Sequence, residues 1–388
     1  MKKNKLTGKK VLIIDGGSRQ CLPMIKGFKK NGFATIVYCS SKMDLGYRYK
    51  YTDKHILVKD TFEDTSITYA NILKILEEDI YELVVPMNDY FAKILSKNKT
   101  ELSKYSNIYV NDWPIFLKAM DKIETMKICM DNNIGCPKTA IFDCIDSFDD
   151  SNWEYPLVVK PRSSFGAKGF STVNDRKELI TRFISTQNKF GPTLVQEYIP
   201  QDGRQYQVEL LIDINGDCSF FMLMEKNRWY PINGGSSTLN TTIHDEKIRT
   251  MCLNLMKKIG WRGYASLDVI EDTRNQEPKI MEINPRINGT VKICYYAGYD
   301  VAKMVYEDSQ NVPIKKCPDY EEGLRLRYFH MDILWFLKSK KRFKCTPSWF
   351  SWKKTKDEIF SWEDLRPGIR YVFVCFGKLR KDKKNRKA

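Results

Sequence analysis

The sequence predicts an α/β and α+β protein in which a doubly wound parallel sheet precedes a mostly antiparallel sheet with helices. Near the N-terminus a buried strand, Val11–Ile14, is followed by a glycine turn, a helical pattern and a second strand, Ala34–Tyr38. This strand–helix–strand order is typical of parallel sheets. After residue 155, short strands separated by polar turns follow one another up to a hairpin formed by residues 266–270 and 280–283. That pattern predicts an antiparallel region.

Length and composition indicate a folded intracellular protein. The chain has 388 residues, 42% of them hydrophobic and 13% aromatic, which suits two or three packed domains rather than disorder. No apolar run approaches the ~18 residues of a membrane span, and Lys2–Lys10 leads straight into the first strand, without the apolar region of a secretory signal. The eleven cysteines form no CxxC pair, and only three histidines are present. We therefore expect a reduced, cytoplasmic protein without a zinc site.

The positive charge lies mainly at the two ends of the chain. Of the net charge of +16, five lysines fall in residues 1–10 and a net +6 falls in residues 377–388, which leaves +5 for everything between. A protein that binds along the phosphates of a nucleic acid needs a positively charged surface on its folded part rather than basic tails alone. We expect no nucleic-acid partner.

The first part of the chain is interpreted as a scaffold. The glycines after the first strand do not spell GxGxxG, and no acidic residue closes the second strand, so a dinucleotide site is not favoured. A helix at 69–79 and a strand at 82–86 continue the alternation to about residue 118. Asn88 and Asp89 follow that strand. They either face a ligand crevice at the carboxyl end of the sheet or are ordinary turn residues.

A phosphate-binding loop is predicted between two strands of the next region. A helical pattern covers residues 120–130, and a Val-Val strand at 155–161 ends near Lys160. The Ser/Gly-rich turn 163–169 that follows lets backbone N–H groups approach phosphate oxygens, and Lys168 adds charge. No helix follows the turn, so it is not a Walker loop. The alternative for Lys160 is an edge lysine whose stem covers apolar surface.

The hairpin carries the strongest chemical signal. Glu282, Asn284 and Arg286 alternate along the second strand and therefore share one face, and the hairpin brings Asp268 close to Glu282. Carboxylate and amide oxygens suit Mg²⁺, and a guanidinium suits a phosphate. By itself this segment is equally compatible with a solvated polar face.

Six motifs in this order resemble the ATP-grasp superfamily over residues 8 to 305. They are Asp121-Lys122, Val-Val-Lys-Pro at 158–161, the loop 163–169, Gln-Glu-Tyr-Ile at 196–199, Leu-Asp-Val at 267–269 and Glu-Ile-Asn-Pro-Arg at 282–286. The superfamily includes carbamoyl-phosphate synthase large chains, biotin carboxylase and D-amino-acid ligases. The resemblance implies an ATP-grasp fold preceded by a pre-ATP-grasp domain. The domains expected are a Rossmann-like domain at 1–118, a small subdomain with the phosphate flap at 119–195, a large subdomain with the metal site at 196–310, and an aromatic, basic segment at 311–388.

The resemblance also implies roles for individual residues. The cofactors implied are ATP and Mg²⁺ (or Mn²⁺). ATP phosphates would be held by Lys122 and Lys160, and covered by a flap that includes Ser163, Ser164, Gly166, Lys168 and Gly169. Adenine would be read at Glu197, Tyr198 and Ile199, the metal would be bound by Asp268, Glu282 and Asn284, and Arg286 with Lys168 would act on the transferred phosphoryl group. Gln205 departs from the Glu of many relatives.

The activity implied is that of a carboxylate–amine ligase. Such an enzyme works through an acyl phosphate, releases ADP and phosphate, and takes small-molecule carboxylate and amine substrates. Here the substrate is expected to be a cell-surface polymer precursor or an amino acid. The alternative is a non-catalytic nucleotide-binding protein at a membrane surface. The oligomeric state stays open.

The C-terminal segment allows two interpretations. Residues 328–376 hold four of the eight tryptophans among many basic residues, and the apolar run 332–337 stands beside the basic run 338–344. The segment either packs as a strap over the core, or attaches the protein to the anionic inner face of a membrane or to a lipid-linked glycan substrate.

Overall fold

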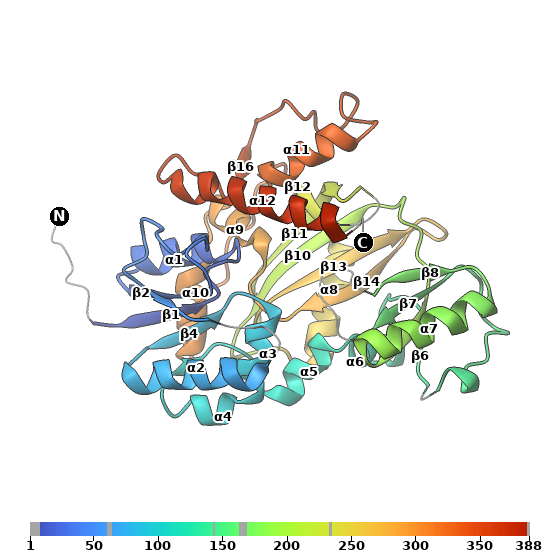
Figure 1. Cartoon of the computed structure of the whole chain (residues 1–388), viewed down its shortest axis with the longest axis horizontal. Coiled ribbons are helices and arrows are strands. Elements are labelled where there is room, and N and C mark those ends of the chain that lie inside the picture. Colours follow the sequence, from blue (N-terminus) through green and yellow to red (C-terminus); the bar gives the residue numbers. More distant parts are fainter. Residues whose placement is uncertain (1–7, 60–63, 143, 163–168, 233–234, 386–388) are drawn as a thin grey trace.

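The computed structural model of the chain describes residues 8–59, 64–142, 144–162, 169–232 and 235–385, with residues 376–385 described by their backbone. Three sheets follow one another along this chain, and the C-terminal segment lies across the top of the view in Figure 1. The α/β class and the doubly wound N-terminal sheet predicted from the sequence are confirmed.

The first sheet is parallel and has helices on both faces. Val11 and Ile13 of its central strand pack toward α1, whereas Leu12 and Ile14 pack toward α2 and α3, because side chains alternate along a strand. The strands, in spatial order, are β3 (Lys54–Leu57), β2 (Ala34–Cys39), β1 (Lys10–Ile14), β4 (Leu83–Pro86) and β5 (Asn107–Ile108). The helices of this region are α1 (Cys21–Lys30), α2 (Thr65–Glu78), α3 (Asp89–Lys97), α4 (Lys99–Leu102) and α5 (Trp113–Met120).

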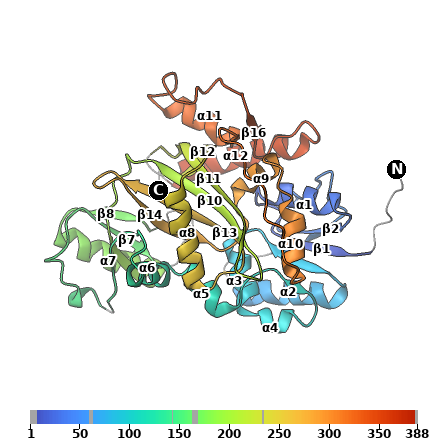
Figure 2. The same ribbon diagram turned by 180° about the vertical axis from the view of Figure 1, so that it is seen from behind.

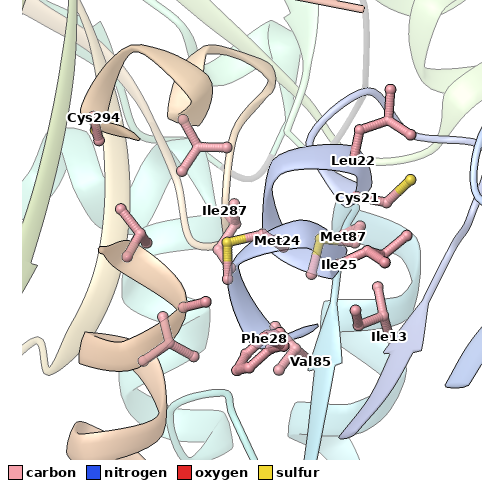
Figure 3. Close-up of a cluster of buried hydrophobic side chains, with 14 of the residues drawn as sticks. Ile13, Cys21, Leu22, Met24, Ile25, Phe28, Val85, Met87, Ile287 and Cys294 are labelled. Carbon is pink, nitrogen blue, oxygen red and sulfur yellow. The ribbon is translucent and has the colours of Figure 1, made fainter. Parts of the chain in front are cut away.

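One apolar core joins this sheet to a segment more than 250 residues later. Met24 and Phe28 of α1 share this core with Ile287 and Cys294, which follow the strand that ends at Asn284, and Met24 lies next to Ile287 (Figure 3). The later segment consists of the turn Gly289–Val291, α9 (Lys292–Tyr296) and α10 (Val301–Ser309). Because these side chains are fully buried, the first sheet is held by packing and not only by polar contacts.

A small antiparallel sheet carries the segments that flank the predicted phosphate loop. Its strands, in spatial order, are β6 (Thr139–Ala140), β9 (Thr193–Glu197), β7 (Leu157–Pro161) and β8 (Ser171–Val173). The flanking elements are α6 (Lys122–Asp131), the turn Ile145–Ser147 and α7 (Arg176–Phe190). Helix α7 covers one face of this sheet, where Leu179 and Phe183 pack on the apolar side chains of β7.

The largest sheet has seven strands and two chemically different faces. Val208, Leu210 and Leu267 point toward α8 and α5, whereas Gln207, Glu209 and Asp268 lie on the opposite face. The strands are β14 (Glu277–Asn284), β13 (Gly263–Asp272), β10 (Gln205–Ile212), β11 (Cys218–Tyr230), β12 (Ser236–Ile243), β15 (Arg325–Arg327) and β16 (Thr355–Asp357), and α8 is Glu246–Ile259. Figure 2 shows α8 lying along the outer face. The predicted β13–β14 hairpin is confirmed.

The C-terminal segment is built into this sheet. Strands β15 and β16, which the sequence did not predict, extend its edge, and α11 (Phe329–Lys338) and α12 (Arg366–Asn385) follow them. Asp332 lies fully buried between two arginines: it accepts bonds from Arg228 at 2.8 and 3.0 Å and from Arg327 at 2.7 Å. Trp335 is buried as well, whereas Leu337 at the end of the run 332–337 is exposed, so the start of the run packs on the core and only part of it is accessible. No helix in the described residues is long and apolar enough to cross a membrane.

We predict that Asp332→Ala destabilises the fold. Removing the carboxylate leaves the guanidinium groups of Arg228 and Arg327 buried without a counter-charge, which typically costs about 3–5 kcal/mol. Chemical denaturation measures the loss, with Asp319→Ala as the control, because the Asp319 side chain is 85% exposed. Equal stability of the two variants would contradict the prediction.

Candidate functional site

Two carboxylates stand opposite each other on the polar face of the seven-stranded sheet. Asp268 of β13 pairs in register with Glu282 of β14, and Ser266 pairs with Asn284. The register shifts by one residue directly after Asp268, which is a β-bulge. The hairpin therefore places the three predicted metal-binding residues, Asp268, Glu282 and Asn284, side by side.

Lysines from three other elements balance these carboxylates. Lys226 of β11 forms an ion pair with Asp268, whose other oxygen accepts from the Asn284 amide at 3.1 Å. Lys122 lies 3.5 Å from Glu282. Partial removal from water and the neighbouring Asp268 raise the pKa of Glu282, although Lys122 and Lys160 oppose the shift. Removal from water and the nearby charge of Lys122 lower the pKa of Lys160 to about 8. The predicted phosphate lysines and the predicted metal ligands thus share one electrostatic environment.

Lys122 is positioned by the start of a helix. It is the first residue of α6, and Asp121 caps that helix by accepting from the Ile123 backbone at 3.0 Å. Arg162, the last described residue before the predicted flap, bonds to Asp121 at 2.5 Å and to Glu124 at 3.1 Å. The base of the flap is therefore tied to the same helix end as Lys122.

Arg286 has an acceptor for each of its five N–H groups. Its guanidinium forms a fork with Asp89 at 3.1 and 2.8 Å and also donates to Asn284 at 3.2 Å, to Asn288 at 2.9 Å and to the carbonyl of Ile287 at 3.3 Å. Burial alone would lower the pKa of Arg286, but Asp89 and the more distant carboxylates raise it. The guanidinium stays charged, next to Asn284.

Glu209 lies on the same face but is closed off from water. It accepts bonds from the Tyr264 hydroxyl and from the Thr290 hydroxyl. Burial raises the pKa of Glu209 to about 8, and these hydrogen bonds only partly offset the shift. Glu209 is therefore mostly protonated at neutral pH and supplies little negative charge to the site.

The predicted adenine-reading residues lie at the end of the small sheet. Glu197 ends β9 and its carboxylate accepts from the Lys138 backbone at 2.7 Å, from Arg274 at 2.9 Å and from Lys279 at 3.3 Å. Tyr198 is half-buried, and Ile199 is buried with 2% of its surface exposed. The Glu197 side chain is therefore committed to ion pairs, which leaves main-chain groups as the adenine contacts that the resemblance implies.

Part of the predicted flap falls outside the described residues: Ser163, Ser164, Gly166 and Lys168. Gly169 is described and has φ +77°, a conformation that residues with a side chain rarely adopt. A Cβ at Gly169 would come within 2.6 Å of the Pro161 ring. Glycine is therefore required where the flap rejoins the sheet.

The donor set suits a hard divalent cation. Asp268, Glu282 and Asn284 offer carboxylate and amide oxygens, and oxygen donors are what Mg²⁺ prefers, with substrate phosphates and water completing its shell. The described residues contain no group of three or more His, Cys, Asp or Glu that could hold an ion by itself. A metal at this place would therefore depend on a phosphate ligand as well.

The sequence did not predict three features of the site. These are the ion pair of Lys226 with Asp268, the raised pKa of Glu209, and the pairing of Arg286 with Asp89. Lys226 lies in the second half of β11, which continues to Tyr230 through an irregular register. Its alternation with Met222 and Met224 along β11 was the available signal.

A separate cavity of about 970 Å³ lies between the first sheet and the far end of the seven-stranded sheet. Its lining includes Tyr109, Asp213, Lys257 and Arg262, and it reaches Arg286, but neither Asp268 nor Glu282 lines it. It is therefore distinct from the cluster of carboxylates and lysines.

Comparison with known proteins agrees with this arrangement. Residues 119–290, which include every element that carries the carboxylates, the lysines and Arg286, match the ATP-grasp domain family. The chain contains an ATP-grasp domain. D-Aspartate ligase from Enterococcus faecium is 25% identical over 272 residues, a match that covers 65% of this chain and 61% of the ligase. This chain thus spans less than two thirds of that relative.

Solved structures share the fold well beyond the ATP-grasp domain. Biotin carboxylase from Campylobacter jejuni superposes with a TM-score of 0.69 at 15% identity, over 83% of this chain and 75% of that one. L-Amino acid ligase from Bacillus licheniformis gives a TM-score of 0.63 at 18% identity, over 79% and 75%. The predicted ATP-grasp fold with a preceding parallel-sheet domain is thereby confirmed.

We predict that Glu209→Gln removes part of the pH dependence of stability. Above about pH 5 the unfolded chain has lost a proton that folded Glu209 keeps until its pKa of about 8. The free energy of unfolding therefore falls as pH rises through this window, by up to about 1.4 kcal/mol per pH unit from this group. Urea denaturation from pH 5 to 8 should show a smaller fall for Glu209→Gln, whereas the exposed control Glu277→Gln should keep it. Equal slopes would contradict the protonated state.

Proposed function

We propose that the protein is an ATP-dependent carboxylate–amine ligase that releases ADP and phosphate. The observation that carries the proposal is the arrangement of Asp268, Glu282 and Asn284 on one sheet face, with Lys122 and Lys160 opposite and Arg286 beside Asn284. Lysines suit phosphate oxygens, and the oxygen set suits Mg²⁺ or Mn²⁺. D-Aspartate ligase, the relative described above, supports this class of reaction.

The chemistry follows from the charges of these groups. A carboxylate oxygen of the substrate attacks the γ-phosphorus of ATP, and the bond between that phosphorus and the β–γ bridging oxygen breaks. The products of this step are ADP and an acyl phosphate. An amine then attacks the acyl carbon, phosphate departs with the bonding electron pair, and the amine loses a proton. Bound Mg²⁺ would neutralise charge on the β- and γ-phosphates. Lys122 and Lys160 would hold those phosphates, and Arg286 would stabilise charge on the moving phosphoryl group.

The proposal predicts a specific product pattern. ADP and phosphate should appear only when one acid and one amine are both supplied with ATP, as measured by coupled ADP release and by mass spectrometry of the amide. A screen of amino acids and uronic acids would identify the substrates. AMP and pyrophosphate as products would contradict the mechanism. ATP binding without turnover would favour a nucleotide-binding protein instead.

We predict that Glu282→Ala lowers kcat by roughly 100-fold or more, because a metal-binding carboxylate is lost from the transition state. Glu277→Ala is a matched control, since Glu277 lies on the same strand and pairs with Lys247 at the surface. The folded state should remain, because 40% of the Glu282 side chain is exposed. Wild-type turnover by Glu282→Ala would remove the metal role from this residue.

A second proposal concerns the surface formed by α11 and the residues after it. Leu337, Phe343 and Phe350 are exposed by 61, 71 and 61%, and the two phenylalanine rings lie 6.5 Å apart. Residues 338–354 contain seven basic and no acidic residues. We call this part, from Leu337 to Lys354, the aromatic–basic surface. Exposed aromatic groups among lysines suit the headgroup region of an anionic membrane. We propose that the cytoplasmic protein binds the inner face of the membrane here.

The aromatic–basic surface should bind anionic but not neutral lipid vesicles. Each lysine near such a surface contributes about 1 kcal/mol, so Lys340→Ala with Lys341→Ala should weaken binding roughly 30-fold at low salt. Phe343→Ser with Phe350→Ser should weaken binding with less effect on its salt dependence. Lys177→Ala with Arg182→Ala on α7 is the control. Equal binding to both vesicle types, or equal loss in the control, would contradict the proposal.

A further inference from the structure

Arg286 is held by a residue from the first domain. Of its five N–H groups, the two that form a planar fork bond to the carboxylate of Asp89, at 3.1 Å from Nε and 2.8 Å from Nη2. The remaining acceptors, Asn284, Asn288 and the Ile287 carbonyl, belong to the segment that carries Arg286. Asp89 is therefore the partner that fixes the guanidinium from outside its own segment, and the only carboxylate among its hydrogen-bond acceptors in the described part of the chain.

Asp89 is itself fixed by the start of α3. It is the first residue of that helix, and Asn88 caps the helix by accepting from the Phe91 backbone at 2.9 Å. The Asn88 amide donates to Asp15 at 2.6 Å, which ties the end of β4 to the end of β1. A carboxylate at a helix N-terminus is favoured by the helix dipole. Only 16% of the Asp89 side chain and 13% of the Arg286 side chain is exposed.

We propose that Asp89 is a positioning residue for phosphoryl transfer: it holds the guanidinium of Arg286 in the plane and place from which Arg286 acts. This inference rests on the ligase function proposed above. A bidentate carboxylate fixes both the direction and the plane of an arginine. Preorganised donors stabilise a transition state because they need no rearrangement when charge develops. Without Asp89, Arg286 keeps its charge but loses the contact that orients it.

A purely structural role for this ion pair is disfavoured by the core that already joins the same regions. Ile287, the neighbour of Arg286, is buried with Met24 of α1, and Met87, two residues before Asp89, belongs to the same core (Figure 3). The backbone segments that carry the two residues are therefore held together by the same apolar core. The apolar core already joins these two segments, so the contribution specific to the Asp89 carboxylate is to orient the Arg286 side chain.

The test is Asp89→Asn, which keeps the shape of the side chain but removes its charge and one acceptor oxygen. We expect kcat to fall roughly 10- to 100-fold, as for a misplaced catalytic group, while the KM for ATP stays near wild type and the variant, although less stable, remains folded at the assay temperature. Asp89→Glu, which restores a carboxylate, should recover part of kcat. In an Arg286→Ala background, Asp89→Asn should have no further effect, because the group it positions is gone.

Asp79→Asn is the matched control. Asp79 pairs with Lys10 within the first domain, so the variant removes an aspartate ion pair from that domain without touching Arg286. It should leave kcat unchanged. Unchanged kcat in Asp89→Asn, or a fall that persists in the Arg286→Ala background, would overturn the inference. A rise in kcat would overturn it as well, because Asp89 would then restrain Arg286 rather than position it.

A binding measurement separates this inference from the ligase proposal. Calorimetry with inorganic phosphate, in the presence of ADP and Mg²⁺, reports on the phosphoryl site without turnover. We expect Asp89→Asn to weaken phosphate binding roughly tenfold and to leave ADP binding unchanged. If Asp89→Asn weakens phosphate binding as expected but the wild-type protein forms no amide from any acid and amine, the ligase proposal fails and the positioning role stands. If the protein is active and both phosphate binding and kcat are insensitive to Asp89→Asn, the positioning role fails.

Discussion

The opposition of Asp268 and Glu282 across one pair of strands is the constraint around which the site is arranged. Two carboxylates in adjacent strand positions repel each other, and the charge of Asp268 raises the pKa of Glu282. The chain balances them with amines from separate elements: Lys226 from β11, Lys122 from the start of α6 and Lys160 from β7. A cation and phosphates could replace these contacts. The repulsion between the two carboxylates destabilises this sheet face when no ligand is bound, and the same charges make it suitable for binding a cation.

The alternation of side chains in the seven-stranded sheet separates stability from chemistry. Residues such as Val208 and Leu267 pack under α8, and their neighbours Gln207 and Asp268 point to the opposite face. Because every second position is committed to the core, the functional face can hold groups that would not be tolerated inside. Glu209 shows the limit of this tolerance. It lies on the functional face but is closed over by Tyr264 and Thr290, and it is kept neutral.

Much of the fold followed from local sequence patterns, whereas the partners of the site residues did not. The β13–β14 hairpin and the opposition of Asp268 and Glu282 follow from alternation, a polar turn and Pro285, all within about twenty residues. The Arg286–Asp89 pair joins positions 197 apart, and no local period encodes it. Asn88 and Asp89 had two interpretations, and the structure gives them both roles: Asn88 caps a helix and Asp89 contacts the site. The C-terminal strands β15 and β16 were too short to show a pattern.

The core that holds the first sheet also contains residues from the other end of the chain. Val11 and Met24 share it with Ile359, Tyr371 and Cys375. Glu358, buried beside them, forms an ion pair with Arg19. During synthesis the first sheet can collapse early, but the contacts that finish its core are not available until about residue 375 has been made. Contacts so distant in sequence form slowly, because a long loop must close first. The nascent N-terminal domain therefore carries an exposed apolar face during most of translation, and the ribosome-bound chain is the form in which it is most open to chaperones and to aggregation.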